Sequence, residues 1–254
     1  MTRPALLVTG GARRIGAAIS RRFGTAGWHV VIHCGRSYAE AQALAAELPS
    51  AEVVRCDLAD GGAALAMIES LAGRIGDWRA LVNSASVFRP DSVAALDVGT
   101  HWEAMQVNAA TPAMMAQAYM RQARSTAGRR VIQVTDQKLA NPNPDFFSYT
   151  MSKHALAATV PMLAMHAAPE DRIYALAPGA ILASHDQAPE EAEVSHRLNL
   201  LKRRTGADEV AEAAFFLATG PLVSGQTLFV DSGQHLLAQP RDVMYLAREG
   251  SPPA

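Results

Sequence analysis

The stretch Ala5-Leu6-Leu7-Val8-Thr9-Gly10-Gly11-Ala12-Arg13-Arg14-Ile15-Gly16 decides the fold of this chain. A short apolar run ends in two glycines, and apolar residues then recur at helical spacing from Ile15 to Phe23. This pattern predicts a strand, a tight turn and a helix. Backbone amides of such a turn, together with the helix N-terminus, can hold a pyrophosphate, so a nucleotide is the expected ligand. An ordinary strand-to-helix turn without a ligand is the alternative.

The rest of the chain alternates between strand-like and helix-like segments. This alternation predicts an α/β fold: a single Rossmann-type, doubly wound domain with a seven-stranded parallel sheet flanked by helices. The domain is expected to span residues 1–240, with a long helix over 101–124 and another over 149–166 that kinks at Pro161. The polar, weakly periodic segment 184–199 is a candidate substrate lid, and 241–254 are expected to form a C-terminal tail.

Composition narrows the class of protein. The chain has 254 residues, 49% of them hydrophobic, and a net charge of −1, which offers no broad electrostatic surface for nucleic acid or an anionic membrane. It contains no apolar run of membrane-spanning length and no signal-peptide pattern, so we expect a cytoplasmic protein that binds a small molecule. Cys34 and Cys56 are expected to pack as small hydrophobic residues, and no metal site is predicted.

The end of the second predicted strand indicates which nucleotide is bound. An acid at this point would bind the ribose 2′-hydroxyl of NAD and repel a 2′-phosphate. The chain has His33, Arg36 and Ser37 there, with Arg13 in the glycine turn, and no acid. Two guanidiniums and a hydroxyl suit a phosphate dianion, which predicts NADPH as the cofactor. Solvated arginines on a loop are the alternative.

A phenol and an amine, Tyr149 and Lys153, lie four residues apart in the predicted helix 149–166. Residues at this spacing share a helix face. An ammonium held near a phenol favours the phenolate and makes the tyrosine a usable proton donor or acceptor near neutral pH. A surface pair without function is the alternative.

Taken together, these motifs resemble the short-chain dehydrogenase/reductase family over nearly the whole chain. The resemblance is carried by the turn 9–16, Asp57, the run 83–86, Asn108, the Tyr149 and Lys153 pair, Pro178-Gly179 and the run 230–233. It implies that Asp57 contacts the adenine, that Lys153 binds the nicotinamide ribose, that Asn108 holds a water in a proton relay, and that the chain forms a homotetramer. The cofactor-binding residues expected are Gly10, Arg13, Arg14, Ile15, Gly16, His33, Arg36, Ser37, Asp57, Leu58, Asn83, Ala85, Ser86, Tyr149, Lys153, Pro178 and Gly179.

Departures from the common family pattern point to one branch. Arg14 stands where most members have glycine, and Asp136 stands thirteen residues before the tyrosine, where most have serine. Both features, with the run Ala85-Ser86-Val87-Phe88, are similar to pteridine reductases and to their bacterial relatives that reduce dihydromonapterin and dihydrofolate. Ser84, where the family usually has a second asparagine, departs from this branch as well.

The chemistry of Asp136 supports the same branch. An ionised carboxylate cannot donate the hydrogen bond that a ketone oxygen needs as it becomes an alkoxide, whereas it can accept one from the amino group and ring N–H groups of a pterin. We therefore expect Asp136, Tyr149, Lys153 and Asn108 to be catalytic. The expected substrate-binding residues are Arg14, Ser86, Phe88, Asp136 and Tyr149, with Phe88 stacked on the flat ring; core packing of Phe88 is its alternative.

These observations predict an NADPH-dependent reductase that transfers hydride to a ring C=N bond of a dihydropterin. Dihydrobiopterin, dihydromonapterin and dihydrofolate are the substrate types considered. A carbonyl or imine reductase on the same scaffold is the first alternative, and a non-catalytic NADP-binding protein is the second.

Overall fold

Seven strands form one parallel sheet in the computed structural model, which describes residues 3–183 and 187–249. Their order is β3-β2-β1-β4-β5-β6-β7, so the chain direction across the sheet reverses at β1. Because ligands bind at such a switch point, outside the carboxyl ends of the strands, the order itself locates the candidate site. The strands are β1 Ala5–Thr9, β2 His29–Cys34, β3 Ala51–Arg55, β4 Trp78–Asn83, β5 Arg130–Val134, β6 Arg172–Pro178 and β7 Thr227–Val230. The predicted Rossmann-type fold class is confirmed.

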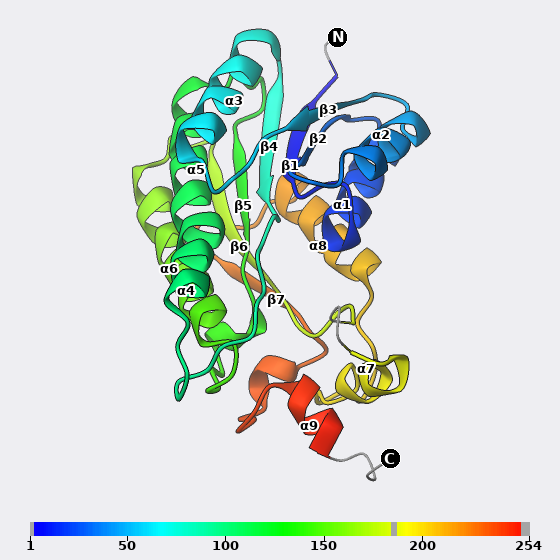
Figure 1. The fold of residues 1–254 in the computed structure, drawn as a ribbon. Coiled ribbons are helices and arrows are strands. Elements are labelled where there is room, and N and C mark those ends of the chain that lie inside the picture. The colour runs from blue at the N-terminus through cyan, green and yellow to red at the C-terminus, as the bar shows by residue number, and fades with distance from the viewer. Residues whose placement is uncertain (1–2, 184–186, 250–254) are drawn as a thin grey trace.

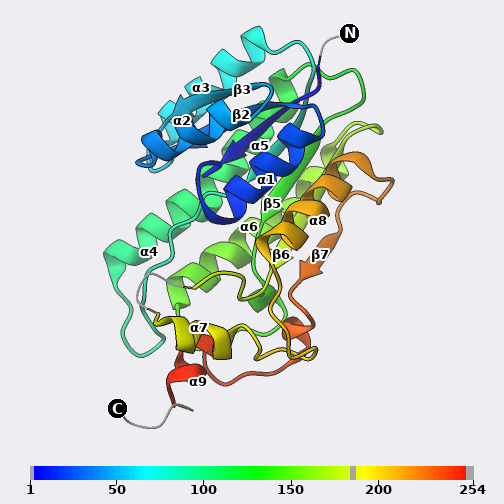
Figure 2. The same cartoon turned by 90° about the vertical axis from the view of Figure 1, so that its right-hand side faces the viewer.

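Helices cover both faces of the sheet, with one layer on each side of it in Figure 1, and the turned view looks onto one of these layers (Figure 2). One layer contains α1 Arg14–Thr25, α2 Tyr38–Glu47 and α8 Ala207–Thr219, and the other α3 Gly61–Arg74, α5 Thr111–Gln122 and α6 Phe147–His166. Each layer has its own apolar core. Cys34 belongs to the first core and Cys56 to the second, and both are free thiols. As predicted, the two cysteines pack as small hydrophobic residues.

The long helix predicted over 101–124 is present as an unbroken helical stretch that contains one π-helical turn. It consists of α4 Val98–Met105, the π-helical turn η1 Gln106–Ala110, and α5. Asp97 caps α4 by accepting from the Thr100 backbone N–H at 2.6 Å. The π-helical turn contains the fully buried Asn108, whose amide binds two other segments, and π-turns of this kind are frequent at functional sites. By contrast, α6 does not end at Pro161 but runs on to His166.

The segments after β6 and β7 lie together beyond the carboxyl ends of the strands (Figure 1). The described part of the predicted lid, 187–199, contains α7 Pro189–Ser195, whereas 184–186 lie outside the described residues. The predicted tail needs correction. After the short turn η3 Gln234–Leu236, helix α9 Val243–Glu249 packs against α7 and buries Val243, Met244 and Ala247; 250–254 are not described.

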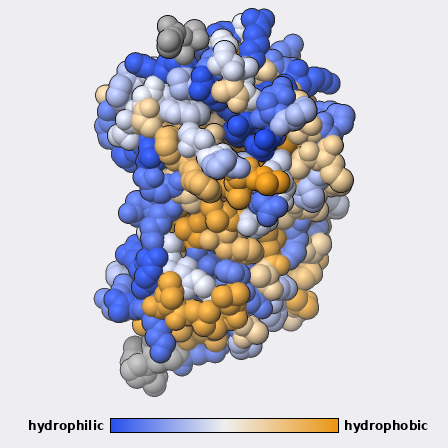
Figure 3. Space-filling view, turned by 180° about the vertical axis from the view of Figure 1, so that it is seen from behind, coloured by the Kyte–Doolittle hydropathy of each residue, from blue (hydrophilic) through white to orange (hydrophobic). Residues whose placement is uncertain are grey.

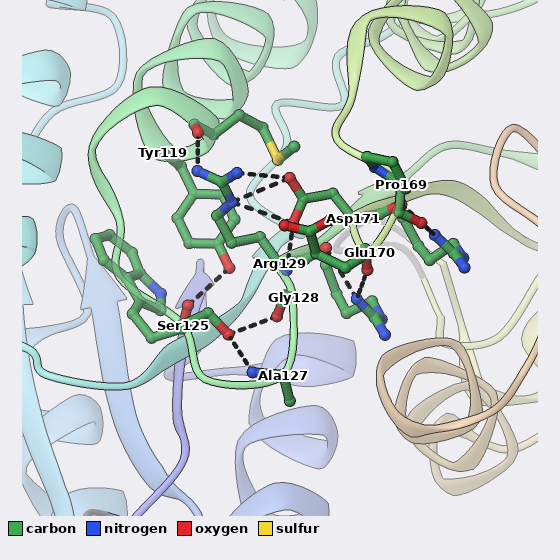
Figure 4. Close-up of polar contacts among 12 residues, drawn as sticks. Tyr119, Ser125, Ala127, Gly128, Arg129, Pro169, Glu170 and Asp171 are labelled. Carbon is green, nitrogen blue, oxygen red and sulfur yellow. Dashed lines mark hydrogen bonds and ion pairs between the residues drawn. The ribbon is translucent and has the colours of Figure 1, made fainter.

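A buried ion pair joins the amino ends of β5 and β6, at the opposite edge of the sheet (Figure 4). The Arg129 guanidinium donates to the Asp171 carboxylate at 2.7 Å, and the Arg129 backbone N–H donates to it at 2.6 Å. Nearby, the Tyr119 hydroxyl donates to the Trp78 carbonyl at 3.0 Å. Asp171 is almost fully buried, so this ion pair connects β5 to β6 and does not belong to the candidate site at the carboxyl ends of the strands.

The surface carries some large apolar side chains. Seen from behind, hydrophobic residues form an area across the middle of the molecule and a second one near its lower end, whereas the upper part is mostly hydrophilic (Figure 3). Trp102 on α4 is 67% exposed, and Met165 on α6 is 81% exposed. Among the described helices, none combines the length and apolar character needed to cross a bilayer.

Candidate active site

Two adjoining cavities open at the carboxyl ends of the strands. The larger has a volume of about 1150 Å³ and lies between the glycine turn, the ends of β2 and β3, and α3. The smaller, about 410 Å³, lies between the glycine turn, Tyr149 and the segments around α7 and α9. Gly10, Ala85 and Ser86 line both cavities, so one elongated ligand can occupy them together. No cluster of His, Cys, Asp and Glu side chains suited to a metal occurs within 3–183 and 187–249.

The glycine turn is tight enough to require its glycines. Gly10 has a φ of +61°, and a Cβ there would lie 3.0 Å from the Cα of Ala85. A Cβ on Gly16 would lie 2.2 Å from the Gly10 carbonyl oxygen. Because Gly10 and Gly16 line the smaller cavity and α1 begins within the turn, the turn fits a pyrophosphate on backbone amides.

His33 supports this turn. Its Nδ1 accepts from the Gly10 backbone N–H at 3.1 Å, and its Nε2 lies 3.0 Å from the Cys56 carbonyl oxygen. The ring is therefore neutral, with the proton on Nε2, and burial lowers its pKa. His33 was predicted as a cofactor ligand and does border the larger cavity, but both ring nitrogens are already bound. It holds the end of β2 to the glycine turn and to the chain leaving β3.

Basic residues line the larger cavity. Arg36 lines it, as predicted, and so do Arg55 at the end of β3 and Arg74 at the end of α3, which the sequence prediction missed. Arg55 donates from Nε to the Gly35 carbonyl at 3.1 Å. Arg13 lines the smaller cavity and lies 3.9 Å from Glu40. Ser37 precedes α2 and does not line either cavity.

Two of the residues predicted to bind the cofactor follow β3. Asp57 and Leu58 line the larger cavity, and the Asp57 carboxylate accepts from the Ala59 backbone N–H at 3.0 Å. The side chain of Asn83 does not line either cavity. It is buried and donates to the Pro112 carbonyl at 3.2 Å and to Gln133 Oε1 at 2.9 Å, so it joins β4 to α5 and β5.

The side chain of Asn108 joins two other segments of the chain by hydrogen bonds. Its Oδ1 accepts from the Val87 backbone N–H at 2.8 Å, and its Nδ2 donates to the Val87 carbonyl at 2.9 Å and to Ser152 Oγ at 3.0 Å. Both amide protons are therefore used, and the side chain has none left to give to a water. Asn108 thereby fixes the loop after β4 against α6, and its predicted part in a water relay stays a prediction.

The smaller cavity contains a tyrosine hydrogen-bonded to a carboxylate. The Tyr149 hydroxyl donates to Asp136 Oδ2 at 2.7 Å, and the Lys138 backbone N–H donates to Asp136 Oδ1 at 2.9 Å. Burial raises the pKa of Asp136. Burial, and then the Asp136 carboxylate, raise the pKa of Tyr149 well above its ordinary value. The expected lowering of the Tyr149 pKa by Lys153 is thus reversed, because burial and then the hydrogen-bonded Asp136 carboxylate both disfavour the phenolate.

Lys153 is buried beneath this pair. Its ammonium donates to the Val134 carbonyl at 2.8 Å and lies 5.6 Å from the centre of the Tyr149 ring. Burial lowers the pKa of Lys153 to about 8, and the Asp136 carboxylate opposes part of that fall. Both members of the predicted pair therefore line one cavity with Asp136, and the surface-pair alternative is excluded.

The predicted substrate-binding residues also lie around this cavity. Phe88 stacks on Phe146, with ring centres 4.1 Å apart and planes at 21°, and meets Tyr149 edge-on at 4.7 Å. Arg14 has a φ of +53° and donates to the carbonyls of Leu182 and Ala183 at 3.2 and 3.0 Å. Further predicted residues that line the cavity are Ile15, Gly16, Ser86, Pro178 and Gly179.

The structure adds wall residues that the sequence prediction missed. They are Lys138 after β5; Gln187, Ser195 and His196 around α7; and Gln234, Asp242, Val243 and Met244 near the C-terminus. Lys138 stood two residues after Asp136 and Gln234 directly after the run 230–233, and the three residues around α7 lay within the predicted lid 184–199. The other C-terminal residues carried no local signal, because their place depends on how α9 packs.

Comparison with known proteins identifies the family. A family model described as enoyl-(acyl carrier protein) reductase matches residues 10–235. The solved structure of FolM, alternative dihydrofolate reductase 1 from Brucella canis complexed with NADP, is 36% identical, with a TM-score of 0.86 and coverage of 92% of this chain and 95% of that one.

Two curated relatives point in different directions. A putative ketoacyl reductase 2 of the granaticin polyketide synthase from Streptomyces violaceoruber is 31% identical over 92% of this chain and 97% of its own length. Dihydromonapterin reductase from Citrobacter koseri is 27% identical over 91% of this chain and 96% of its own length. The family match, the sheet order and the Tyr149 and Lys153 site lead to one conclusion: the chain belongs to the short-chain dehydrogenase/reductase family and is an oxidoreductase.

Proposed function

We propose that this protein is an NADPH-dependent reductase of a dihydropterin, of the dihydrobiopterin, dihydromonapterin or dihydrofolate type. The observation that carries the proposal is the hydrogen bond of 2.7 Å from the Tyr149 hydroxyl to the Asp136 carboxylate inside the smaller cavity. A carboxylate at this point offers an acceptor to the amino and N–H groups of a pterin, and in its protonated form a donor to a ring nitrogen.

Several features support NADPH as the cofactor. The glycine turn leaves room for a pyrophosphate, and Arg36 and Arg55 line the larger cavity where a 2′-phosphate would lie, with no acid at the end of β2. The related FolM structure contains NADP. When bound, NADPH supplies a hydride to the carbon of the C=N bond.

The residues of the smaller cavity would manage the proton that the ring nitrogen takes up. Burial keeps the proton on Tyr149, and the raised pKa of Asp136 lets the pair share a proton and pass it on. Lys153 stays fixed on the Val134 carbonyl, where it can bind a ribose hydroxyl. Phe88 can cover one face of a flat ring, because its own second face already rests on Phe146. The segment 187–199 would act as the lid over this ring.

An NADPH oxidation assay tests the proposal. Dihydrobiopterin, dihydromonapterin, dihydrofolate and a simple ketone are compared side by side. We expect turnover of at least one dihydropterin, and we expect Asp136→Ser to reduce it by about 100-fold while leaving NADPH binding intact. Turnover of the ketone with no dihydropterin reduction, or full dihydropterin activity in Asp136→Ser, would overturn the proposal.

A ketone reductase is the second candidate, because the granaticin ketoacyl reductase is among the more similar relatives. Asp136 argues against it, since an ionised carboxylate cannot donate to a developing alkoxide. If this candidate were correct, Asp136→Ser would retain or raise ketone turnover.

We also propose that the chain assembles as a homotetramer. The exposed Trp102 on α4 and Met165 on α6 support a partner surface, because large apolar side chains are often covered by a partner chain. Sedimentation equilibrium tests this directly. A monomer at micromolar concentration would exclude it.

A further inference from the structure

A buried ion pair connects the C-terminal segment to the chain that holds Asp136. Asp242, which directly precedes α9, places Oδ2 at 2.6 Å from the Lys138 ammonium. The two side chains are only 11% and 5% exposed. Both residues line the smaller cavity, so the pair forms part of its wall.

Lys138 lies between two carboxylates. Its backbone N–H donates to Asp136 Oδ1 at 2.9 Å, while its ammonium pairs with Asp242 and lies 5.1 Å from the centre of the Phe146 ring. Among the described residues, the other ionisable groups facing this wall are Tyr149 and Lys153 on α6, Arg14 at the start of α1, His196 after α7, and the Asp145 and Arg241 pair.

Asp242 is itself held in place. Its backbone N–H donates to Asp145 Oδ2 at 2.9 Å, and its Oδ1 accepts from the Met244 backbone N–H at 3.0 Å. Met244 in turn packs with Phe146 and Tyr149. The carboxylate is therefore presented to Lys138 by a folded segment and not by a loose terminus.

We propose that Asp242 is a positioning residue for the proton-handling pair: by binding the Lys138 ammonium, it keeps that charge away from Asp136 and so sets the ionisation of the Asp136 carboxyl. The inference rests on the proposed function only in assigning proton transfer to Asp136. Its physical basis is competition between two carboxylates for one ammonium in a poorly hydrated wall.

This competition predicts shifts of opposite sign. In Asp242→Asn the Lys138 ammonium loses the carboxylate that it binds, so its charge acts more strongly on Asp136 and the pKa of Asp136 should fall by about one unit. In Lys138→Met the ammonium is gone and Asp242 remains as a nearby anion, so the pKa of Asp136 should rise by about one unit. A residue that merely stabilised the fold would not move the pKa in opposite directions.

The test is a titration of the Asp136 carboxyl by NMR in protein labelled with ¹³C at aspartate side chains. The signal is identified by its loss in Asp136→Asn. Glu249→Gln is the matched control, because it removes one negative charge from the same segment at the exposed pair with Arg241 and should leave the titration unchanged. Because this readout needs no substrate, it stays decisive if dihydropterins are not reduced.

The pH profile of kcat/KM, measured with whichever substrate of the panel is reduced best, should shift in the same directions as the titration. The Kd of NADPH, measured by fluorescence, should stay within about twofold of the wild-type value in Asp242→Asn, Lys138→Met and Glu249→Gln. An unchanged Asp136 pKa in Asp242→Asn, or shifts of the same sign in the two variants, would overturn the proposal. If Lys138→Met fails to fold, the pKa of Asp136 in Asp242→Asn still supports or overturns the proposal.

Discussion

Replacing Lys153 with methionine should stabilise the protein near neutral pH while removing its activity. Lys153 is only 2% exposed, and burial lowers its pKa from 10.5 to about 8. The folded protein therefore binds this proton more weakly than the unfolded chain does, which means that a charged Lys153 opposes folding. Methionine has a similar shape and no charge to desolvate.

The size of the effect follows from the pKa shift. A shift of about 2.5 units corresponds to about 3 kcal/mol of lost stability. The variant also loses the hydrogen bond of 2.8 Å to the Val134 carbonyl, which costs about 1 kcal/mol. The net gain is about 2 kcal/mol, or a rise in Tm of about 6 °C for a chain of this size.

The dependence on pH has a defined sign. Below pH 8 the lysine is charged in both states, so the wild type carries the whole penalty and the variant has its full advantage. Between pH 8 and pH 10.5 the folded protein releases the proton first, and the advantage declines as the pH rises.

Thermal unfolding followed by circular dichroism at several pH values measures this difference. Lys202→Met is the matched control, because Lys202 is exposed and its replacement should change stability by less than about 0.5 kcal/mol. A Lys153→Met protein that is no more stable than the wild type at pH 7, or whose advantage does not decline toward pH 10.5, would refute the reasoning.

Three further predictions address the site and the fold. Tyr149→Phe should lower kcat by at least about 100-fold while the NADPH Kd, from fluorescence titration, stays within about twofold; near wild-type turnover would remove the tyrosine from the mechanism. Arg36→Gln should weaken NADPH binding about 10-fold without affecting NADH, since it removes a charge-assisted bond to the 2′-phosphate; equal losses for both cofactors would place that phosphate elsewhere. Asp171→Asn should lower the free energy of unfolding in urea by about 3 kcal/mol, because it leaves Arg129 buried without its carboxylate. Arg129→Met added to it should recover part of the loss, and a single-variant loss below about 0.5 kcal/mol would contradict this account.

The fold was predictable because its signals are local. Apolar runs closed by glycines and polar residues mark the strands, and buried parallel strands need no longer-range information to be recognised. The π-helical turn within the helix expected over 101–124 was not predictable in this way, since Asn108 in that turn binds Val87 and Ser152, 21 and 44 residues away along the chain.

The candidate site was predictable where its residues lie at the ends of strands or follow a spacing rule. The glycine turn, Asp57 and the Tyr149 and Lys153 pair follow from residue type and spacing, and parallel strands bring their carboxyl ends to one edge. His33 and Asn83 were placed in the right region, but their side chains support the site from behind it, since both are occupied by bonds to other segments.

By itself, the sequence determined the sheet, the place of the nucleotide and the presence of a tyrosine, a lysine and an aspartate near one another. Only the tertiary structure decided the state of these groups. A residue's pKa depends on how deeply the residue is buried and on the charges near it, so burial first and the Asp136 carboxylate second raise the pKa of Tyr149. The tertiary structure also decided that the C-terminal segment forms part of the wall of the smaller cavity. Asp242 contacts Lys138, which lies about a hundred residues away along the chain, and no local sequence pattern encodes such a contact.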